Sequence, residues 1–303
     1  MTRATVLVLV LIIILASGCS GMPEAEDDLA QARRAYVDRQ YLEAERLYER
    51  YLKAHQDGEA RWEVWNRLVE MALAVRNNPH DAIDLLEAMY LEYADDEDKA
   101  RSILHRLGTL AMENRVLDKA VEVWQRLLTA PDTTSLDHAV AYRNIGEAYI
   151  ATGDYDLALD ALRSCVETDA PPAEHALCLY GLAQTHFFLE NYDKAESMLE
   201  GVLASSGIEQ DLRMIATLLL ADVFDHLDMP EKAVSLLQGI RDEYPNPMVV
   251  EKRLEYLGQR LGVVVKRTAP VKDSDIERND PILETEQQHV PESSKDNDPY
   301  SGI

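Results

Sequence analysis

Apolar residues recur every three or four positions through most of the chain, in runs separated by turn-forming residues. This spacing places the apolar side chains on one face of a helix, and so predicts a series of amphipathic α-helices. Six of the runs carry an alanine near their start, at Ala44, Ala82, Ala120, Ala158, Ala195 and Ala233. Successive alanines are about 38 residues apart, and this nearly constant step indicates an internal repeat.

Each repeat is predicted to be a pair of antiparallel helices. In residues 145–167, Gly153 and Asp154 separate two helical patterns and mark the turn between them. One such pair cannot bury its apolar face alone, so successive pairs must stack. After the sixth repeat, the pattern of residues 247–262 predicts a terminal helix whose charged face closes the stack against solvent.

Residue size supports the same arrangement. Gly146 and Ala158 are small where the two helices of the fourth pair would cross, whereas Tyr149 and Leu162 are large enough to fill the wider spaces between neighbouring pairs. A period of 3.6 residues places Gly146 and Tyr149 on one face of the first helix, and Ala158 and Leu162 on one face of the second.

The repeat resembles the tetratricopeptide repeat. The fourth repeat matches the eight signature positions of that family at Tyr142, Ile145, Gly146, Tyr149, Tyr155, Ala158, Leu162 and Cys165. The fifth and sixth repeats match at most of these positions, and the first three match more weakly. The resemblance implies an all-α fold over residues 25–262, a right-handed α-solenoid of about six helix pairs with a C-terminal capping helix. The family repeat is shorter, at about 34 residues, so we expect longer second helices or linkers to take up the excess.

The N-terminus has the pattern of an export signal. About 13 uncharged residues lie between Ala4 and Ala16, whereas a membrane-spanning helix needs roughly 20. Together with Arg3 and the small residues that follow, they predict a signal peptide over residues 1–18. Residues 15–19, LASGC, resemble the lipobox of bacterial lipoproteins, although Ala16 stands where that family more often has leucine.

The lipobox resemblance implies that Cys19 carries a lipid and begins a short linker, residues 19–24. Ser20 resembles the position that forwards lipoproteins to the outer membrane, so the expected location is periplasm-facing and lipid-anchored. An ordinary secreted protein with a fortuitous Cys19 is the alternative.

The C-terminal residues 263–303 lack apolar periodicity and are rich in Asp, Glu, Pro, Ser and Asn, so a disordered acidic tail is predicted there. The whole chain has a formal net charge of −25, which argues against nucleic acid as a partner. Neither a phosphate-binding glycine loop, nor a zinc-binding H-E-x-x-H pair, nor a G-x-S-x-G nucleophile turn is present. We therefore expect no enzyme activity, no metal and no cofactor.

Cys165 and Cys178 are the cysteines that follow Cys19. In an oxidising compartment they can form a disulfide that closes a loop of roughly 14 residues and contributes about 3 kcal/mol. Two reduced, buried cysteines are the equally good alternative. A metal site with His175 is disfavoured, because the sequence offers no further ligand nearby.

The family resemblance also indicates where a partner would bind. In tetratricopeptide arrays the first helix of each pair lines the groove, with exposed columns at the fifth and ninth positions. These columns include Arg67, His105, Arg143, Tyr180 and Gln184. One hypothesis is that Arg67, His105 and Arg143 form a positive stripe for acidic groups of a partner. The alternative is that nearby Asp and Glu neutralise them. The Lys and Asn residues of the chaperone-binding carboxylate clamp are absent.

These features predict a scaffold that binds envelope proteins during envelope assembly, secretion or pilus biogenesis. The alternative is an accessory subunit of a cell-wall or polysaccharide system that binds a glycan or its synthase.

Overall fold

The computed structural model describes residues 24–262, with side chains from residue 28 onward. Within this range the chain forms thirteen α-helices and no β-strand. The helices form six successive pairs followed by one terminal helix, so the predicted all-α solenoid is confirmed. The predicted signal peptide, Cys19 and the acidic tail lie outside the described residues.

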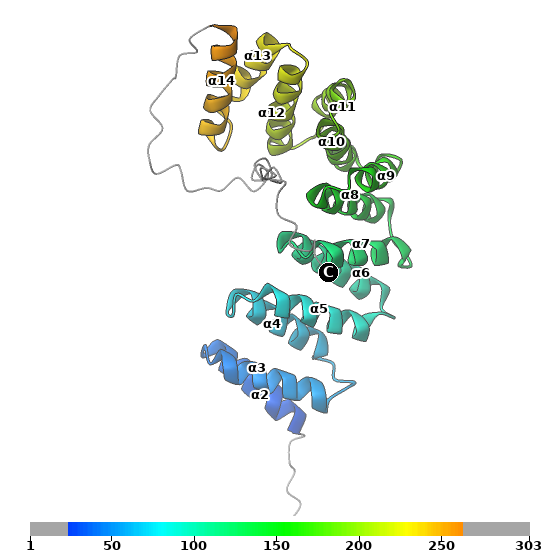
Figure 1. The fold of residues 1–303 in the computed structure, drawn as a ribbon. Coiled ribbons are helices and arrows are strands. Elements are labelled where there is room, and N and C mark those ends of the chain that lie inside the picture. The colour runs from blue at the N-terminus through cyan, green and yellow to red at the C-terminus, as the bar shows by residue number, and fades with distance from the viewer. Residues whose placement is uncertain (1–23, 263–303) are drawn as a thin grey trace, which may run out of the picture. The chain divides into compact units, whose positions relative to one another are not determined.

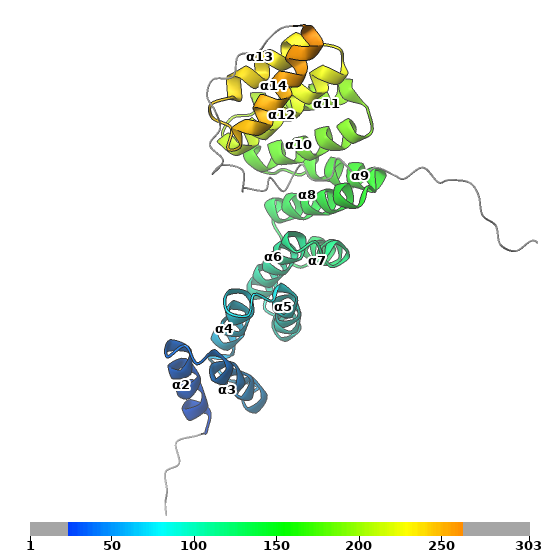
Figure 2. The same ribbon diagram turned by 60° about the vertical axis from the view of Figure 1, so that its left-hand side comes forward.

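The chain divides into two compact units after Pro171. Unit 1 contains four helix pairs (Figures 1 and 2): α2 Glu24–Val37 with α3 Tyr41–Ala54, α4 Arg61–Ala74 with α5 Pro79–Tyr93, α6 Glu97–Glu113 with α7 Leu117–Thr129, and α8 Ser135–Thr152 with α9 Tyr155–Val166. Unit 2 contains α10 Pro172–Phe188 with α11 Tyr192–Ala204, α12 Gln210–His226 with α13 Pro230–Ile240, and the terminal helix α14 Pro247–Leu261.

In the last four pairs the first helix is longer than the second. The first helices α6, α8, α10 and α12 have 17, 18, 17 and 17 residues. Their second helices α7, α9, α11 and α13 have only 13, 12, 13 and 11. The expectation of longer second helices is therefore wrong for these four pairs, whereas the helices of the first two pairs have 14 and 14 residues and 14 and 15 residues.

Small residues set the spacing within a pair, as predicted, but Leu162, which was expected to fill the space between neighbouring pairs, lies against Gly146 of its own pair. A Cβ added at Gly108 would lie 2.5 Å from Cε2 of Trp124, and one added at Gly146 would lie 2.5 Å from Cγ of Leu162. Trp124 and Leu162 are 1% and 0% exposed, so the large side chain of one helix fills the gap left by the glycine of the other.

Each first helix is followed by a residue with a left-handed backbone conformation. These residues are Arg39, Asn77, Arg115, Gly153, Glu190 and Asp228, with φ between 49° and 83°. Backbone N–H groups that follow each turn bond back to the helix, as Gln40 does to the carbonyl of Ala35 at 2.8 Å and Met229 to that of Phe224 at 2.8 Å. A glycine occupies this position only at 153, so the other five turns adopt the left-handed conformation with a side chain.

The terminal helix α14 has the predicted two-sided character. Val250, Leu254 and Leu257 are buried against the core of unit 2. Lys252, Glu255, Tyr256, Gln259 and Arg260 are exposed on the same helix. Arg253 forms an ion pair with Asp222 of α12 at 2.9 Å, which fixes the helix to its neighbour.

Candidate interaction surface

The three predicted cations lie on consecutive first helices of unit 1. Arg67 is on α4, His105 on α6 and Arg143 on α8. We call the side formed by the polar residues of α2, α4, α6 and α8 the first-helix face; its residues discussed below are Arg33, Tyr36, Asn66, Arg67, His105, Arg106 and Arg143.

An acidic side chain lies beside each of these three residues. The guanidinium of Arg67 lies 2.7 Å from Oε2 of Glu70 and 4.9 Å from the ring centroid of Tyr36. Arg143 lies 2.8 Å from Oε1 of Glu147, one helical turn away, and is only 18% exposed. The pKa of Glu70 is lowered, chiefly because its carboxylate accepts hydrogen bonds from the Tyr36 hydroxyl and from Arg67, which together outweigh its desolvation.

His105 belongs to a separate network at the start of α8. Its Nε2 lies 2.7 Å from Oδ1 of Asp137, and its ring contacts that of Trp124 edge to face at 5.6 Å. Asp137 is buried, and its Oδ2 accepts hydrogen bonds from the backbone N–H and the hydroxyl of Thr134. The pKa of Asp137 is lowered, because these bonds and that of His105 outweigh the desolvation that would raise it.

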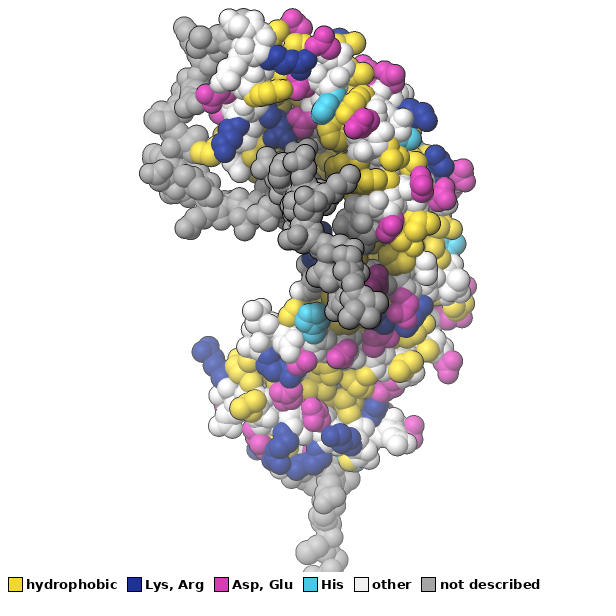
Figure 3. All heavy atoms as spheres, viewed as in Figure 1, with side chains coloured by type: hydrophobic (Ala, Val, Ile, Leu, Met, Phe, Trp, Pro, Cys, Tyr) yellow, Lys and Arg dark blue, Asp and Glu magenta, His cyan; other side chains and the backbone are white. Residues whose placement is uncertain are grey.

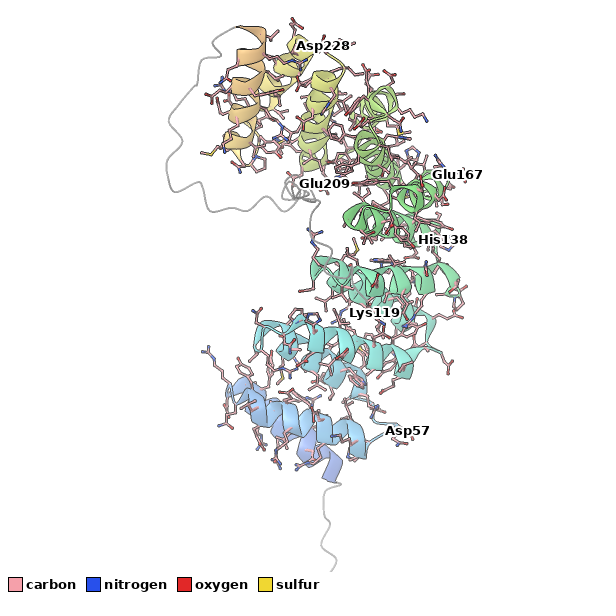
Figure 4. The ribbon with its side chains drawn as sticks, in the orientation of Figure 1. Asp57, Lys119, His138, Glu167, Glu209 and Asp228 are labelled. Carbon is pink, nitrogen blue, oxygen red and sulfur yellow. The ribbon has the colours of Figure 1, made fainter. Side chains whose placement is uncertain are left out.

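On the face of unit 1 that Figure 3 shows, acidic and basic side chains are interspersed. On the second helices, Lys119, labelled in Figure 4, reaches Oε1 of Glu87 at 3.2 Å, and Arg126 reaches Oε2 of the same residue at 2.9 Å. Arg67, His105 and Arg143 thus each lie beside a carboxylate, and their part in binding a partner stays a prediction.

Arg106, beside His105 on α6, was missed by the sequence reasoning. It is half-buried, and one of its guanidinium nitrogens donates to Oδ1 of Asn66 on α4 at 2.5 Å. The amide nitrogen of Asn66 donates to the carbonyl of Trp62 at 2.7 Å, which fixes the orientation of Oδ1. Within residues 28–262, no carboxylate lies within 4.0 Å of Arg106.

The pKa of Arg106 is lowered because burial removes water from its guanidinium. The paired arginines Arg33, Arg61 and Arg67 instead have raised pKa values, mainly through hydrogen bonds to carboxylates. An arginine has five N–H donors, and the partner of Arg106 is neutral, so this residue can still receive an anion. Because Asn66 precedes Arg106 by 40 residues, no local spacing in the sequence signals the contact.

The remaining predicted groove residues lie in unit 2. Tyr180 and Gln184 are both half-buried on α10, four residues apart, and Tyr180 packs against the core of that unit. Their part in binding stays a prediction.

The two cysteines that follow Cys19 are fully buried. Cys165 lies on α9 in unit 1 and Cys178 on α10 in unit 2. Each is in the disulfide-bonded state, and their pairing with each other stays a proposal.

Neither a metal cluster nor a spanning helix occurs in the part of the chain that the structure describes. No group of three or more His, Cys, Asp or Glu side chains is placed to hold a metal ion there. None of the helices in residues 24–262 is long and apolar enough to cross a membrane.

A pocket of about 520 Å³ lies at the edge of unit 1, between the turn of the first pair and the end of α4. We call it the hairpin-edge pocket; it is lined by Arg39, Gln40, Tyr41, Leu42, Glu43, Glu45, Met71, Val75 and Arg76.

Comparisons with known proteins agree with this fold. Residues 113–202 match the family model of anaphase-promoting complex, cyclosome, subunit 3, and residues 180–246 match a tetratricopeptide repeat model. No curated protein matches the chain.

Solved structures with a similar fold have low sequence identity. A tetratricopeptide repeat protein from Parabacteroides merdae is 16% identical, with a TM-score of 0.53 over 78% of this chain and 88% of that one. The apo form of the quorum sensor NprR from B. thuringiensis is 11% identical, with a TM-score of 0.52 over 79% of this chain and 72% of that one. At these identities the likeness establishes a tetratricopeptide-type fold alone.

Proposed function

We propose that this chain is a scaffold that holds a partner protein on the first-helix face of unit 1, with Arg106 receiving a carboxylate of the partner. Cys19 carries a lipid that anchors the scaffold in the outer membrane, facing the periplasm. The process served is envelope assembly, secretion or pilus biogenesis, which are processes that require several proteins to be held together.

The half-buried Arg106 carries the proposal. Its guanidinium has already lost part of its hydration, and Asn66 holds it in place. A carboxylate of the partner therefore forms a strong interaction with Arg106, and the arginine side chain loses little conformational entropy on binding. Arginine matches the planar geometry of a carboxylate, and arginines are enriched among the residues that dominate binding energy at protein interfaces. The neutralised neighbours Arg67 and Arg143 contribute shape and hydrogen bonding in place of net charge.

In-cell crosslinking followed by affinity purification and mass spectrometry tests the scaffold function. Wild type is compared with Arg106→Gln and with the control Arg34→Gln, because Arg34 is an exposed arginine whose side chain forms no hydrogen bond or ion pair among the described residues. Loss of a charge-assisted hydrogen bond weakens binding by about 10- to 100-fold. We expect Arg106→Gln to lose a set of proteins that wild type and Arg34→Gln both capture.

Equal capture by all three forms would remove Arg106 from the interface. If no form captures a protein, the scaffold proposal is wrong, and co-sedimentation with purified peptidoglycan then tests the glycan-binding alternative.

The lipid anchor has its own test. Cells grown with an alkyne-labelled palmitate should give a labelled wild-type protein and an unlabelled Cys19→Ser variant, and wild type should fractionate with the outer membrane. A wild-type protein that is unlabelled and recovered in the soluble periplasmic fraction would show the fortuitous cysteine of an ordinary secreted protein.

A further inference from the structure

The hairpin-edge pocket has apolar walls and lies apart from the Arg106 site. Met71, which is 2% exposed, and Val75 at the end of α4 both line it. Val75 lies about two helical turns beyond Asn66 along α4, and Arg106 is not among the lining residues. The volume of about 520 Å³ falls within the range typical of ligand sites.

Leu42 lines the same pocket and is 82% exposed in the first turn of α3. In the other five repeats the equivalent residue, two positions before the aligned alanine, is polar: His80, Asp118, Asp156, Asp193 and Glu231. An acidic side chain in the first turn stabilises a helix through the helix dipole. A leucine gives up that stabilisation and exposes apolar surface. Helix formation therefore does not explain Leu42, whereas contact with another apolar group does.

One cation that lines the pocket has no carboxylate beside it. Of the two lining glutamates, Glu45 pairs with Arg76 at 2.9 Å and Glu43 pairs with Arg46 at 2.6 Å. Arg39 is exposed, and its side chain forms no hydrogen bond or ion pair among the described residues. Its guanidinium donors are therefore open to a carboxylate.

Gln40 adds a neutral polar group next to Arg39. It lines the pocket, is exposed, and its side-chain amide forms no hydrogen bond among the described residues. An amide both donates and accepts, so it can pair with the backbone of a bound peptide. Asp38, which precedes Arg39, does not line the pocket. Apolar walls together with a cation and an amide fit a peptide that carries an aliphatic side chain next to an acidic one.

We propose that the hairpin-edge pocket binds a short acidic segment of a partner protein. An aliphatic side chain of that segment packs against Leu42, Met71 and Val75, and a neighbouring carboxylate pairs with Arg39. Binding removes the exposed surface of Leu42 from water, which is the apolar gain that the free protein lacks. The pocket is separate from the Arg106 site, so this inference goes beyond the proposed function and is tested independently of it.

Fluorescence anisotropy of the full chain with a labelled synthetic peptide, SELLEDS, tests the pocket. The matched peptides are SKLLKKS, which reverses the charge, and SESSEDS, which lacks the leucines. We expect wild type to bind SELLEDS about tenfold more tightly than either matched peptide, since each of these lacks one of the two contacts. Leu42→Ser should weaken binding of SELLEDS by about tenfold, because an apolar contact is lost. Leu91→Ser is the matched control and should leave binding unchanged, because Leu91 is 76% exposed on α5 and does not line the pocket.

Arginine variants separate this pocket from the site at Arg106. Arg39→Gln should weaken binding of SELLEDS by about tenfold, because a charge-assisted hydrogen bond is lost. Arg34→Gln and Arg106→Gln should not weaken it, because neither residue lines the pocket. Binding that is lost in Arg106→Gln but kept in Leu42→Ser would place the peptide on the first-helix face and overturn the proposal.

A second copy of the chain is the competing occupant of the pocket. Sedimentation velocity that gives a dimer for wild type and a monomer for Leu42→Ser would assign the pocket to self-association and overturn the proposal. Monomers in both cases, together with the expected peptide binding, would support it. No binding of SELLEDS to wild type, or equal binding by Leu42→Ser and Leu91→Ser, would also overturn it.

Discussion

Gly146 of α8 lies against Leu162 of α9 so closely that a methyl group at the glycine would come within 2.5 Å of Cγ of the leucine. Leu162 is fully buried. The absence of a side chain at Gly146 is thus what allows the two helices of the fourth pair to approach.

Replacing Gly146 with alanine should therefore destabilise the protein. Overpacking of a filled core costs about 1–3 kcal/mol, so we expect a lower midpoint in urea unfolding followed by circular dichroism. Gly239→Ala is the control, since a Cβ at Gly239 in α13 meets nothing within 4 Å and removes a flexible residue from a helix. Equal effects of the two variants would contradict the tight crossing.

Two substitutions in the turns after the first helices should change the stability of the protein in opposite directions. Gly153 has a φ of 83°, and a Cβ there meets no atom within 4 Å, so Gly153→Ala should cost about 1 kcal/mol through backbone strain alone. Arg115 has a φ of 59° in the equivalent turn of the third pair, so Arg115→Gly should relieve strain and stabilise by about 0.5–1 kcal/mol. Thermal unfolding monitored by circular dichroism measures both, and a loss of stability in Arg115→Gly would refute the second prediction.

Asp137 makes stability depend on pH. The pKa of Asp137 is lowered in the folded state. Its contribution to the free energy of unfolding is therefore fully present above its unfolded-state pKa of about 3.9, and is lost as the pH falls through its folded-state pKa. Asp137→Ala removes the N3 carboxylate of the capping box of α8, whose N-cap is Thr134, and the partner of His105, and should cost about 1–2 kcal/mol at pH 7. Urea unfolding at pH 7 and at the lowest pH where the protein stays folded should give a difference between wild type and variant that narrows in acid. A constant difference would contradict the assigned role of the carboxylate.

The contacts that were readable from the sequence are those set by local spacing. Glu70 follows Arg67 by three residues and Glu147 follows Arg143 by four, which are the separations that meet on a helix surface. The helix pairs were predictable for the same reason, because the apolar period recurs in every repeat.

Contacts between neighbouring pairs were not readable in this way. Asn66 and Arg106 are 40 residues apart and His105 and Asp137 are 32 apart, so each contact depends on how the pairs stack. The hairpin-edge pocket likewise lies between the turn of the first helix pair and the end of α4, which belongs to the second pair. The unusual length of the repeat left this stacking open, because the sequence did not reveal in which helices or linkers the extra residues lie.

The proposed Cys165–Cys178 disulfide predicts a definite thiol count. In the Cys19→Ser variant, protein denatured without reductant should show no free thiol, and reductant should release two. Closing a loop of roughly 14 residues contributes about 3 kcal/mol, so reductant should also lower the unfolding midpoint. A Cys165→Ala/Cys178→Ala variant should not respond to reductant. Two free thiols in the untreated protein would instead support the reduced alternative.

Arg106 and Arg61 are both shielded from water, but their replacement should have different effects. Arg61 is 12% exposed, forms an ion pair with Glu92 and donates to the carbonyls of Leu52 and His55 at 2.5 and 2.7 Å. Arg61→Met leaves these acceptors and a partly buried carboxylate unpaired, and should cost about 3 kcal/mol or more. Arg106→Met removes a desolvated charge that has no carboxylate partner among the described residues, so stability should stay within about 1 kcal/mol of wild type or increase. Urea unfolding of both variants measures the contrast.

The two outcomes for Arg106→Met assign different roles to Arg106. A variant that is stable but fails to capture partners assigns the residue to binding. A strong loss of stability would assign it to the fold.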